Sequence, residues 1–121
     1  MWSRTIRAVA VVKDLFFVAR FREQARLSGA DITFARTPLD LSAALSDPAD
    51  LIIIDLTVAG WDYEGFFAEI EGLPTSPPIL GITTHAVARR TQPLHHRCTR
   101  VVTRETLTRE LGTILREGIA A

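Results

Sequence analysis

The sequence lacks the features of a disulfide-stabilised, membrane-spanning or strongly charged protein. Its one cysteine, Cys98, has no partner for an internal disulfide, so the fold does not depend on an oxidising compartment and we expect a cytoplasmic protein. Lys13 and Asp14 interrupt the apolar run that begins at Ala8, too early for a signal peptide or a membrane span. The formal net charge is zero, which gives no overall attraction to nucleic acid or to an anionic membrane.

Charge is nevertheless distributed unevenly along the chain. Residues 40–73 contain eight acidic side chains and neither Lys nor Arg, whereas residues 85–121 contain seven Arg and three acidic side chains. Lys13 is the single lysine of the sequence. This pattern predicts two surfaces of opposite sign.

The composition is that of an ordinary globular protein. The 121 residues are 47% apolar and 23% charged, and a chain of this length buries roughly two thirds of its unfolded surface in one core. Neither an internal repeat nor an interdomain linker is present, so residues 1–121 are expected to form one domain.

Short β-branched apolar runs alternate with longer amphipathic segments, which indicates an α/β fold with a parallel sheet covered on both faces. Strands are expected at residues 7–12, 31–35, 51–55, 78–83 and 100–103. Helices are expected at residues 15–28, 38–46, 64–73, 86–92 and 105–118, the fourth ending at Pro93. The pattern is that of a single doubly wound (βα)5 unit, a three-layer sandwich.

Two aromatic pairs and a histidine cluster have competing interpretations. In Phe16-Phe17 and in Phe66-Phe67 we expect one ring to enter the core and the other to be exposed. His85, His95, His96 and Cys98 invite a zinc site, but the spacing lacks a second ligand pair and arginines lie nearby, which favours a solvated loop.

Polar residues follow the strands at the edge where open parallel sheets concentrate their chemistry. The strand ends contain Lys13-Asp14, Asp55-Leu56, Thr83-Thr84 and Thr103-Arg104. These positions, with the loop Asp55-Leu56-Thr57-Val58-Ala59-Gly60-Trp61-Asp62, resemble the response-regulator receiver family, also called CheY-like. The resemblance covers nearly the whole chain and implies a flavodoxin-like sheet of order 2-1-3-4-5 in a two-component signalling protein.

The resemblance assigns roles to several residues of this pocket. Asp55 matches the phosphoacceptor, Asp14 the second acid of the acidic pair, Thr83 the phosphoryl-contacting hydroxyl, and the Thr57 carbonyl a magnesium ligand, with Thr84 beside them. Asp14, Asp55 and Thr57 would therefore form the magnesium site.

Three departures weaken that chemistry. Lys13 replaces the first acid, Thr103 replaces the pocket lysine with Arg104 after it in place of proline, and Arg100 replaces the switch aromatic. Phosphoryl transfer needs charge neutralisation and an oxygen-rich magnesium shell. We therefore expect a vestigial metal site and no cofactor, magnesium binding only if the pocket still functions.

The leading functional hypothesis is a non-enzymatic pseudo-receiver, which acts by binding a protein partner in two-component signalling without phosphorylation. The alternative is a functional receiver phosphorylated on Asp55 by a histidine kinase. Expected partners are a signalling protein or a histidine kinase, or a second copy in a homodimer. A ligand-binding flavodoxin-like domain is disfavoured, because no glycine-rich loop follows the first strand.

Three further expectations concern the structure. The Thr103–Arg104 peptide should be trans, since a non-proline cis bond costs about 2.5 to 4 kcal/mol. The ammonium of Lys13 should lie in the pocket and pair with Asp55, with Asp14 or with both. A basic face built from the fourth helix, fifth strand and fifth helix should bind an acidic partner; its predicted members are Arg89, Arg90, Arg97, Arg100, Arg104 and Arg109.

Overall fold

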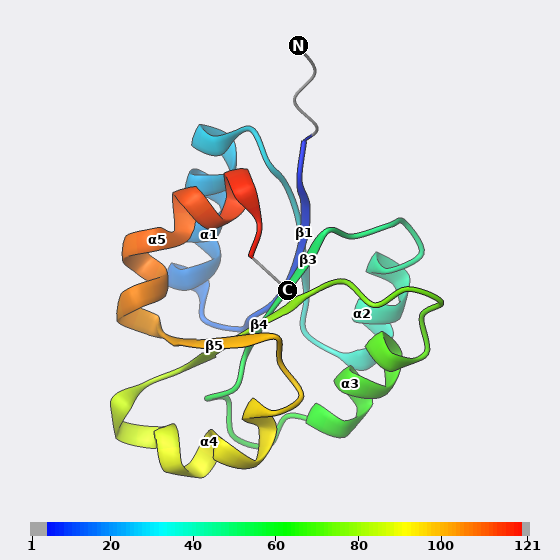
Figure 1. Cartoon of the computed structure of the whole chain (residues 1–121), viewed down its shortest axis with the longest axis vertical. Helices are drawn as coiled ribbons and strands as arrows, with labels where there is room; N and C mark the ends of the chain where they lie inside the picture. The colour runs from blue at the N-terminus through cyan, green and yellow to red at the C-terminus, as the bar shows by residue number, and fades with distance from the viewer. Residues whose placement is uncertain (1–4, 120–121) are drawn as a thin grey trace.

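Five parallel strands form one sheet in the order β2-β1-β3-β4-β5, as expected (Figure 1). The computed structural model describes residues 5–119. Its strands lie within one residue of the expected bounds: β1 Arg7–Val11, β2 Asp31–Ala35, β3 Leu51–Asp55, β4 Ile79–Thr83 and β5 Arg100–Thr103.

Five α-helices alternate with the strands, and a short 3-10 helix, η1 (His85–Val87), precedes the fourth. Their bounds are α1 Leu15–Ser28, α2 Pro38–Ala44, α3 Tyr63–Glu71, α4 Ala88–His95 and α5 Arg104–Glu117. A polar side chain caps the first turn of α1, α2, α3 and α5, in each case the Asp or Thr that precedes the helix. Gly29 ends α1 at a φ of 70°, a left-handed conformation that glycine adopts at little cost.

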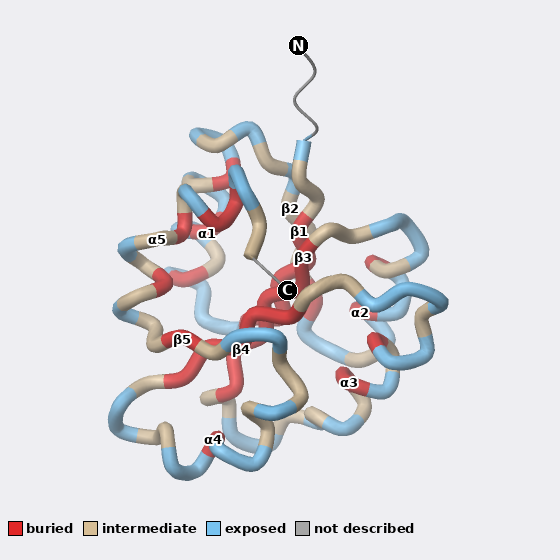
Figure 2. Tube along the Cα trace, viewed as in Figure 1, coloured by how far each residue is buried: buried red, intermediate tan, exposed pale blue. Residues whose placement is uncertain are grey.

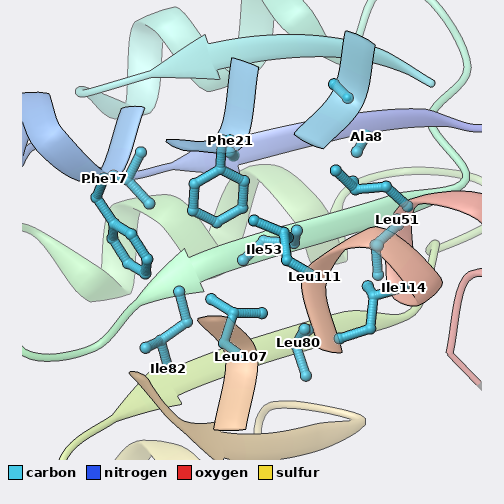
Figure 3. Close-up of a cluster of buried hydrophobic side chains, with 14 of the residues drawn as sticks. Ala8, Phe17, Phe21, Leu51, Ile53, Leu80, Ile82, Leu107, Leu111 and Ile114 are labelled. Atoms are coloured by element: carbon cyan, nitrogen blue, oxygen red, sulfur yellow. The ribbon is translucent and has the colours of Figure 1, made fainter. Parts of the chain in front are cut away.

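The sheet separates two hydrophobic cores, because successive strand residues point to opposite faces. Ala8, Ala10 and Val12 of the first strand and its extension belong to the core under α1 and α5, whereas Val9 and Val11 belong to the core under α2 and α3. Buried residues follow the strands through the centre of the molecule (Figure 2). Figure 3 shows the first core, where side chains of α1 and α5 meet over the sheet.

Pro93 does not end the fourth helix, contrary to expectation. Helix α4 continues through Leu94 to His95, although proline removes one backbone donor from the helix. One tertiary contact and one local hydrogen bond support the last turn of this helix. Leu94 packs against the core under α2 and α3, and the Thr91 hydroxyl is hydrogen-bonded to Nε2 of His95, 2.7 Å away.

The two aromatic pairs behave differently. Phe17 is 5% exposed and Phe16 is 90% exposed, which confirms the expected division of that pair. The same expectation is wrong for Phe66 and Phe67, because both are fully buried. Phe66 packs edge-on against Trp61 with ring centroids 5.3 Å apart, and the guanidinium of Arg97 covers Phe67 at 4.7 Å. A cationic side chain from after α4 thus shields the ring that α3 alone would expose.

Two smaller points complete the fold. Within residues 5–119 every peptide bond is trans, including Thr103–Arg104, as expected. None of the helices in this part of the chain is long and apolar enough to cross a membrane.

The neighbouring rings of α1 provide a matched test of this packing. We expect Phe17→Ala to lower the free energy of unfolding by about 3 to 5 kcal/mol, because it leaves a cavity under α1 and α5. Phe16→Ala should change it by less than about 0.5 kcal/mol, since that ring is in solvent. Urea denaturation of both variants measures the two values, and equal losses would contradict the assignment of the core.

Candidate functional site

Asp55 ends β3 at the carboxyl edge of the sheet and is 1% exposed. Its Oδ1 accepts hydrogen bonds from the backbone N–H of Thr57 at 2.9 Å and from the Thr57 hydroxyl at 2.6 Å. These bonds hold the carboxylate at the start of the following loop. Because an isolated buried charge is costly, the remaining oxygen requires a cationic partner.

Arg104, the first residue of α5, supplies that partner. Its Nη2 donates to Oδ2 of Asp55 at 3.0 Å, and its Nη1 lies 3.5 Å from Oδ2 of Asp14. The guanidinium carbon lies 4.5 Å from the centre of the Phe17 ring, within the range of a cation–π contact. One planar cation therefore joins the carboxyl end of β3 to the starts of α1 and α5.

The prediction that Lys13 pairs with these carboxylates is wrong. Lys13 is exposed, and among the described residues the ion pairs of Asp14 and Asp55 go to Arg104. The reason lies in where each side chain begins in the fold. Lys13 leaves the sheet after its inward-facing neighbour Val12, whereas Arg104 starts the helix beside α1, and its guanidinium lies over the Phe17 ring.

Asp14 performs two tasks with its two oxygens. Oδ1 accepts from the backbone N–H groups of Phe16 and Phe17 and so caps α1, while Oδ2 faces Arg104. The cap places a carboxylate at the positive end of α1, and the ion pair then connects that end to α5.

A second arginine covers the third position assigned by the receiver resemblance. Nη2 of Arg90, on α4, donates to the backbone carbonyl of Thr57 at 3.1 Å. Asp14, Asp55 and the Thr57 carbonyl, the three oxygen sources of the expected magnesium site, thus each face a guanidinium.

These residues do not fit a magnesium ion. Magnesium binds an octahedral shell of oxygens, and here a divalent ion would have to displace Arg104 and Arg90 or lie beside them. Two unit charges about 4 Å apart interact by roughly 1 kcal/mol in water and 4 kcal/mol in a partly shielded site, and a divalent ion doubles the repulsion. No group of three or more His, Cys, Asp or Glu side chains within residues 5–119 offers another metal site.

Three of the four predicted pocket threonines form hydrogen bonds with groups other than Asp55. The Thr83 hydroxyl is hydrogen-bonded to that of Thr91 at 2.7 Å, and Thr91 continues the chain to His95. Thr84 caps η1 through the N–H of Val87, and Thr103 caps α5 through the N–H of Thr106. Thr57 alone among them contacts Asp55.

Tyr63 supports the loop beneath the site. Its hydroxyl donates to the carbonyl of Val58 at 2.7 Å and lies 3.1 Å from the carbonyl of Asp55. Burial, with a smaller effect of the Asp55 charge, raises the pKa of Tyr63 to about 12. The side chain therefore stays a neutral donor over the physiological pH range.

The six arginines predicted as one basic face are not all available. Arg90 and Arg104 are held at the site, Arg97 pairs with Glu64 and Glu71 of α3, and Arg100 lies 3.5 Å from Glu110. Among the described residues, Arg89 and Arg109 are the members without an ion pair or hydrogen bond. The acidic stretch of the sequence thus neutralises part of the basic stretch within the molecule.

Solved structures resemble this one over most of its length. CheY4, a chemotaxis response regulator of Vibrio cholerae, has a TM-score of 0.72 at 18% identity, with 92% of this chain and 99% of that chain covered. The receiver domain of the sensor histidine kinase PA1611 from Pseudomonas aeruginosa PAO1 has a TM-score of 0.75 at 16% identity, with 98% and 100% covered. A response regulator from Hahella chejuensis has a TM-score of 0.74 at 13% identity, with 97% and 100% covered.

The chain has the receiver fold. Neither a protein-family model nor a curated protein sequence matches it. The PA1611 receiver is described with a magnesium ion coordinated in its active-site cleft. In this receiver fold, guanidinium groups cover the oxygens that the resemblance assigns to that ion.

The position of Arg104 in the sequence carries one signal of its role. A cation at the first position of a helix opposes the helix dipole, which costs about 0.3 to 1 kcal/mol unless an acid compensates. Arg104 directly follows the cap residue Thr103, so its position favours a nearby acid, but Glu105 in the same turn already offers one and the signal does not single out Asp55. Arg90 and Thr91 carry no comparable signal, because their contacts depend on where α4 packs.

The Asp55–Arg104 pair generates a stability prediction. Arg104→Ala should lower the free energy of unfolding by about 2 to 4 kcal/mol, because it leaves the buried carboxylate without a cation. Arg109→Ala, a change of the same kind at an exposed site, should cost less than about 0.5 kcal/mol. Adding Asp55→Asn to Arg104→Ala should recover part of the loss. Urea denaturation distinguishes these cases, and equal values for the two arginine variants would show that the pair contributes little.

Tyr63 generates a titration prediction that is simple to measure, because it is the only tyrosine in the chain. Near-ultraviolet absorbance should show tyrosinate forming around pH 12, not pH 10. The raised pKa favours the folded state up to about pH 10, and this contribution should be lost as pH rises from 10 to 12. Tyr63→Phe should lack that loss. Ionisation near pH 10 with an intact far-ultraviolet spectrum would contradict the burial of the hydroxyl.

Proposed function

We propose that this protein is an atypical receiver, a pseudo-receiver that binds a signalling protein in two-component signalling without being phosphorylated. The observation that carries the proposal is the contact of Arg104 with both Asp55 and Asp14. The Arg104 side chain supplies, within the protein, the positive charge that a phosphoryl-transfer site takes from a metal ion. The single cysteine fits a reducing compartment, so we place this activity in the cytoplasm.

The hydrogen bonds at Asp55 support the same proposal. One carboxylate oxygen accepts from Thr57 and the other from Arg104, so both are occupied before a phosphodonor arrives. Attack through Oδ2 would have to break the ion pair, attack through Oδ1 would have to break the hydrogen bonds from Thr57, and a metal would have to displace the arginine that covers the Thr57 carbonyl. The Thr83 hydroxyl, bonded to Thr91, is not directed at Asp55. These features favour a non-enzymatic domain with one stable pocket state.

The alternative is a working phosphoacceptor, and one observation favours it. The Arg104 side chain is 37% exposed, and arginines stabilise the charge that develops on a transferring phosphoryl group. If Arg104 turned from Asp55 toward an incoming phosphoryl group, Asp55 would become the acceptor for a partner histidine kinase.

Intact-mass measurement tests the proposal. After incubation with acetyl phosphate and magnesium, the unmodified protein should gain no phosphoryl group, while a working receiver treated in parallel does. The triple variant Lys13→Asp, Thr103→Lys, Arg104→Pro restores the receiver pattern and should gain one. Adding Asp55→Asn to the triple variant should abolish the gain, which identifies the acceptor.

The decisive result is that of the unmodified protein, since the triple variant alters the cap of α5. A phosphoryl group on the unmodified chain that is lost in Asp55→Asn would establish the alternative and overturn the pseudo-receiver proposal.

A further inference from the structure

The N-terminal end of α1 exposes two large apolar side chains beside the arginine-filled site. Leu15 is 76% exposed and Phe16 is 90% exposed, although they immediately precede the buried Phe17. Scattered exposed apolar residues are ordinary, but adjacent ones at the rim of a site are characteristic of interaction surfaces. The two exposed side chains add nothing to the packing of the core, because the buried face of the helix consists of Phe17, Phe21 and Ala25.

Cations surround these two side chains. Lys13 precedes them and Arg20 lies one turn after Phe16, and among residues 5–119 neither has an ion pair or hydrogen bond. Phe16 and Arg20 line one shallow hollow with Phe17, Asp14 and Arg104. Helix α1 itself carries three arginines and one glutamate, and that glutamate pairs with Arg26. We call Lys13, Leu15, Phe16 and Arg20 the α1 patch.

We propose that the α1 patch binds an acidic segment of another protein, with an apolar side chain of that segment on Leu15 and Phe16 and a carboxylate on Arg20. The proposal rests on the proposed function, in that it assigns a binding surface to a receiver fold whose pocket carboxylates are already paired with Arg104. Arginine and aromatic side chains at a rim of this kind contribute much of the binding energy at protein interfaces.

Charge complementarity favours an acidic segment. Arg104 pairs with both Asp14 and Asp55, and these three groups together carry one negative charge; with Lys13 and Arg20, which have no ion pair, the surface around the apolar side chains carries a net charge of plus one. Phe16, Phe17 and Arg20 line the same hollow, so an apolar side chain on the rings and a carboxylate on Arg20 belong to neighbouring residues of one segment. A basic segment would instead be repelled by both cations.

Two other occupants of the patch are separated from an acidic segment by the size of the surface and by experiment. An anionic membrane would attract Lys13 and Arg20, but the exposed apolar surface is confined to one helix end, which offers little area to bury in a bilayer. A second copy offers Leu39, 80% exposed and next to Asp40, on α2. Reciprocal pairing of α1 of each copy with α2 of the other would close a two-fold dimer, and the self-association measurement below distinguishes this occupant from an acidic segment.

The experiment selects peptides from a random-sequence display library on the immobilised full chain, without any phosphodonor. We expect the selected peptides to carry Asp or Glu beside a large apolar residue. Binding of the synthesised peptides, measured by fluorescence anisotropy, should weaken about tenfold or more with Phe16→Ser and with Arg20→Glu. It should also weaken between low and physiological salt. Replacing the peptide acid by lysine should restore binding to Arg20→Glu, which a merely structural role of Arg20 would not produce.

Matched controls use the same substitutions away from the patch. Leu27→Ser changes an exposed leucine at the other end of α1, and Arg116→Glu an exposed arginine of α5. Both should leave peptide affinity within about twofold, since surface changes distant from a contact have small effects. Thermal denaturation of all four variants shows that each remains folded.

Four results would overturn the proposal. They are selection of peptides without acidic residues, affinity that is insensitive to Phe16→Ser and Arg20→Glu, binding to phosphatidylserine vesicles that Phe16→Ser abolishes, and self-association that Phe16→Ser abolishes. Failure here is distinguishable from failure of the proposed function. Phosphorylation of the unmodified chain overturns only the pseudo-receiver proposal, whereas loss of selective peptide binding in an unphosphorylatable chain overturns only the α1 patch.

Discussion

The buried charge of Asp55 is the constraint on which the rest of the site depends. A carboxylate that is 1% exposed requires both hydrogen bonds and an opposite charge, and Thr57 and Arg104 supply them. Because Arg104 also faces Asp14 and lies on Phe17, the same requirement joins β3, α1 and α5 at one edge of the sheet. The pocket is therefore closed by an interaction that also contributes to the packing of the helices.

The geometry of arginine explains how one residue can replace several parts of a phosphorylation site. A guanidinium offers donors in a planar fork, so Arg104 reaches two carboxylates and stacks on an aromatic ring at the same time. Its Nε is nevertheless a buried nitrogen without a hydrogen-bond partner, so these contacts do not satisfy the whole group. The exposed ring of Phe16 beside this closed site then provides a surface for recognition that requires no change at Asp55.

Much of the fold could be predicted from local patterns, and the errors occurred where distant segments meet. Helix α1 has the expected bounds and α2 begins at the expected residue, because the glycine that ends α1 and the threonine that caps α2 act within a few residues. Pro93 was misjudged, because the support for the last turn of α4 comes partly from the core against which Leu94 packs. Phe67 was misjudged for a similar reason, since the Arg97 side chain that covers it is thirty residues away in the chain.

The sequence alone determined the strand positions, the strand order inferred through the receiver resemblance, and the acids Asp14 and Asp55 at the edge of the sheet. Periodicity, helix caps and alternation of apolar residues are local properties, and they specify where each strand ends, whereas the receiver resemblance supplied which strand ends meet. The identity of the cation was decided only by the tertiary structure. Lys13 and Arg104 both lie next to strand ends, but the approach of α5 to α1 directs Arg104 across Phe17 to Asp55 and leaves Lys13 in solvent. Side-chain reach depends on how helices pack, and sequence spacing does not encode that packing in any single residue.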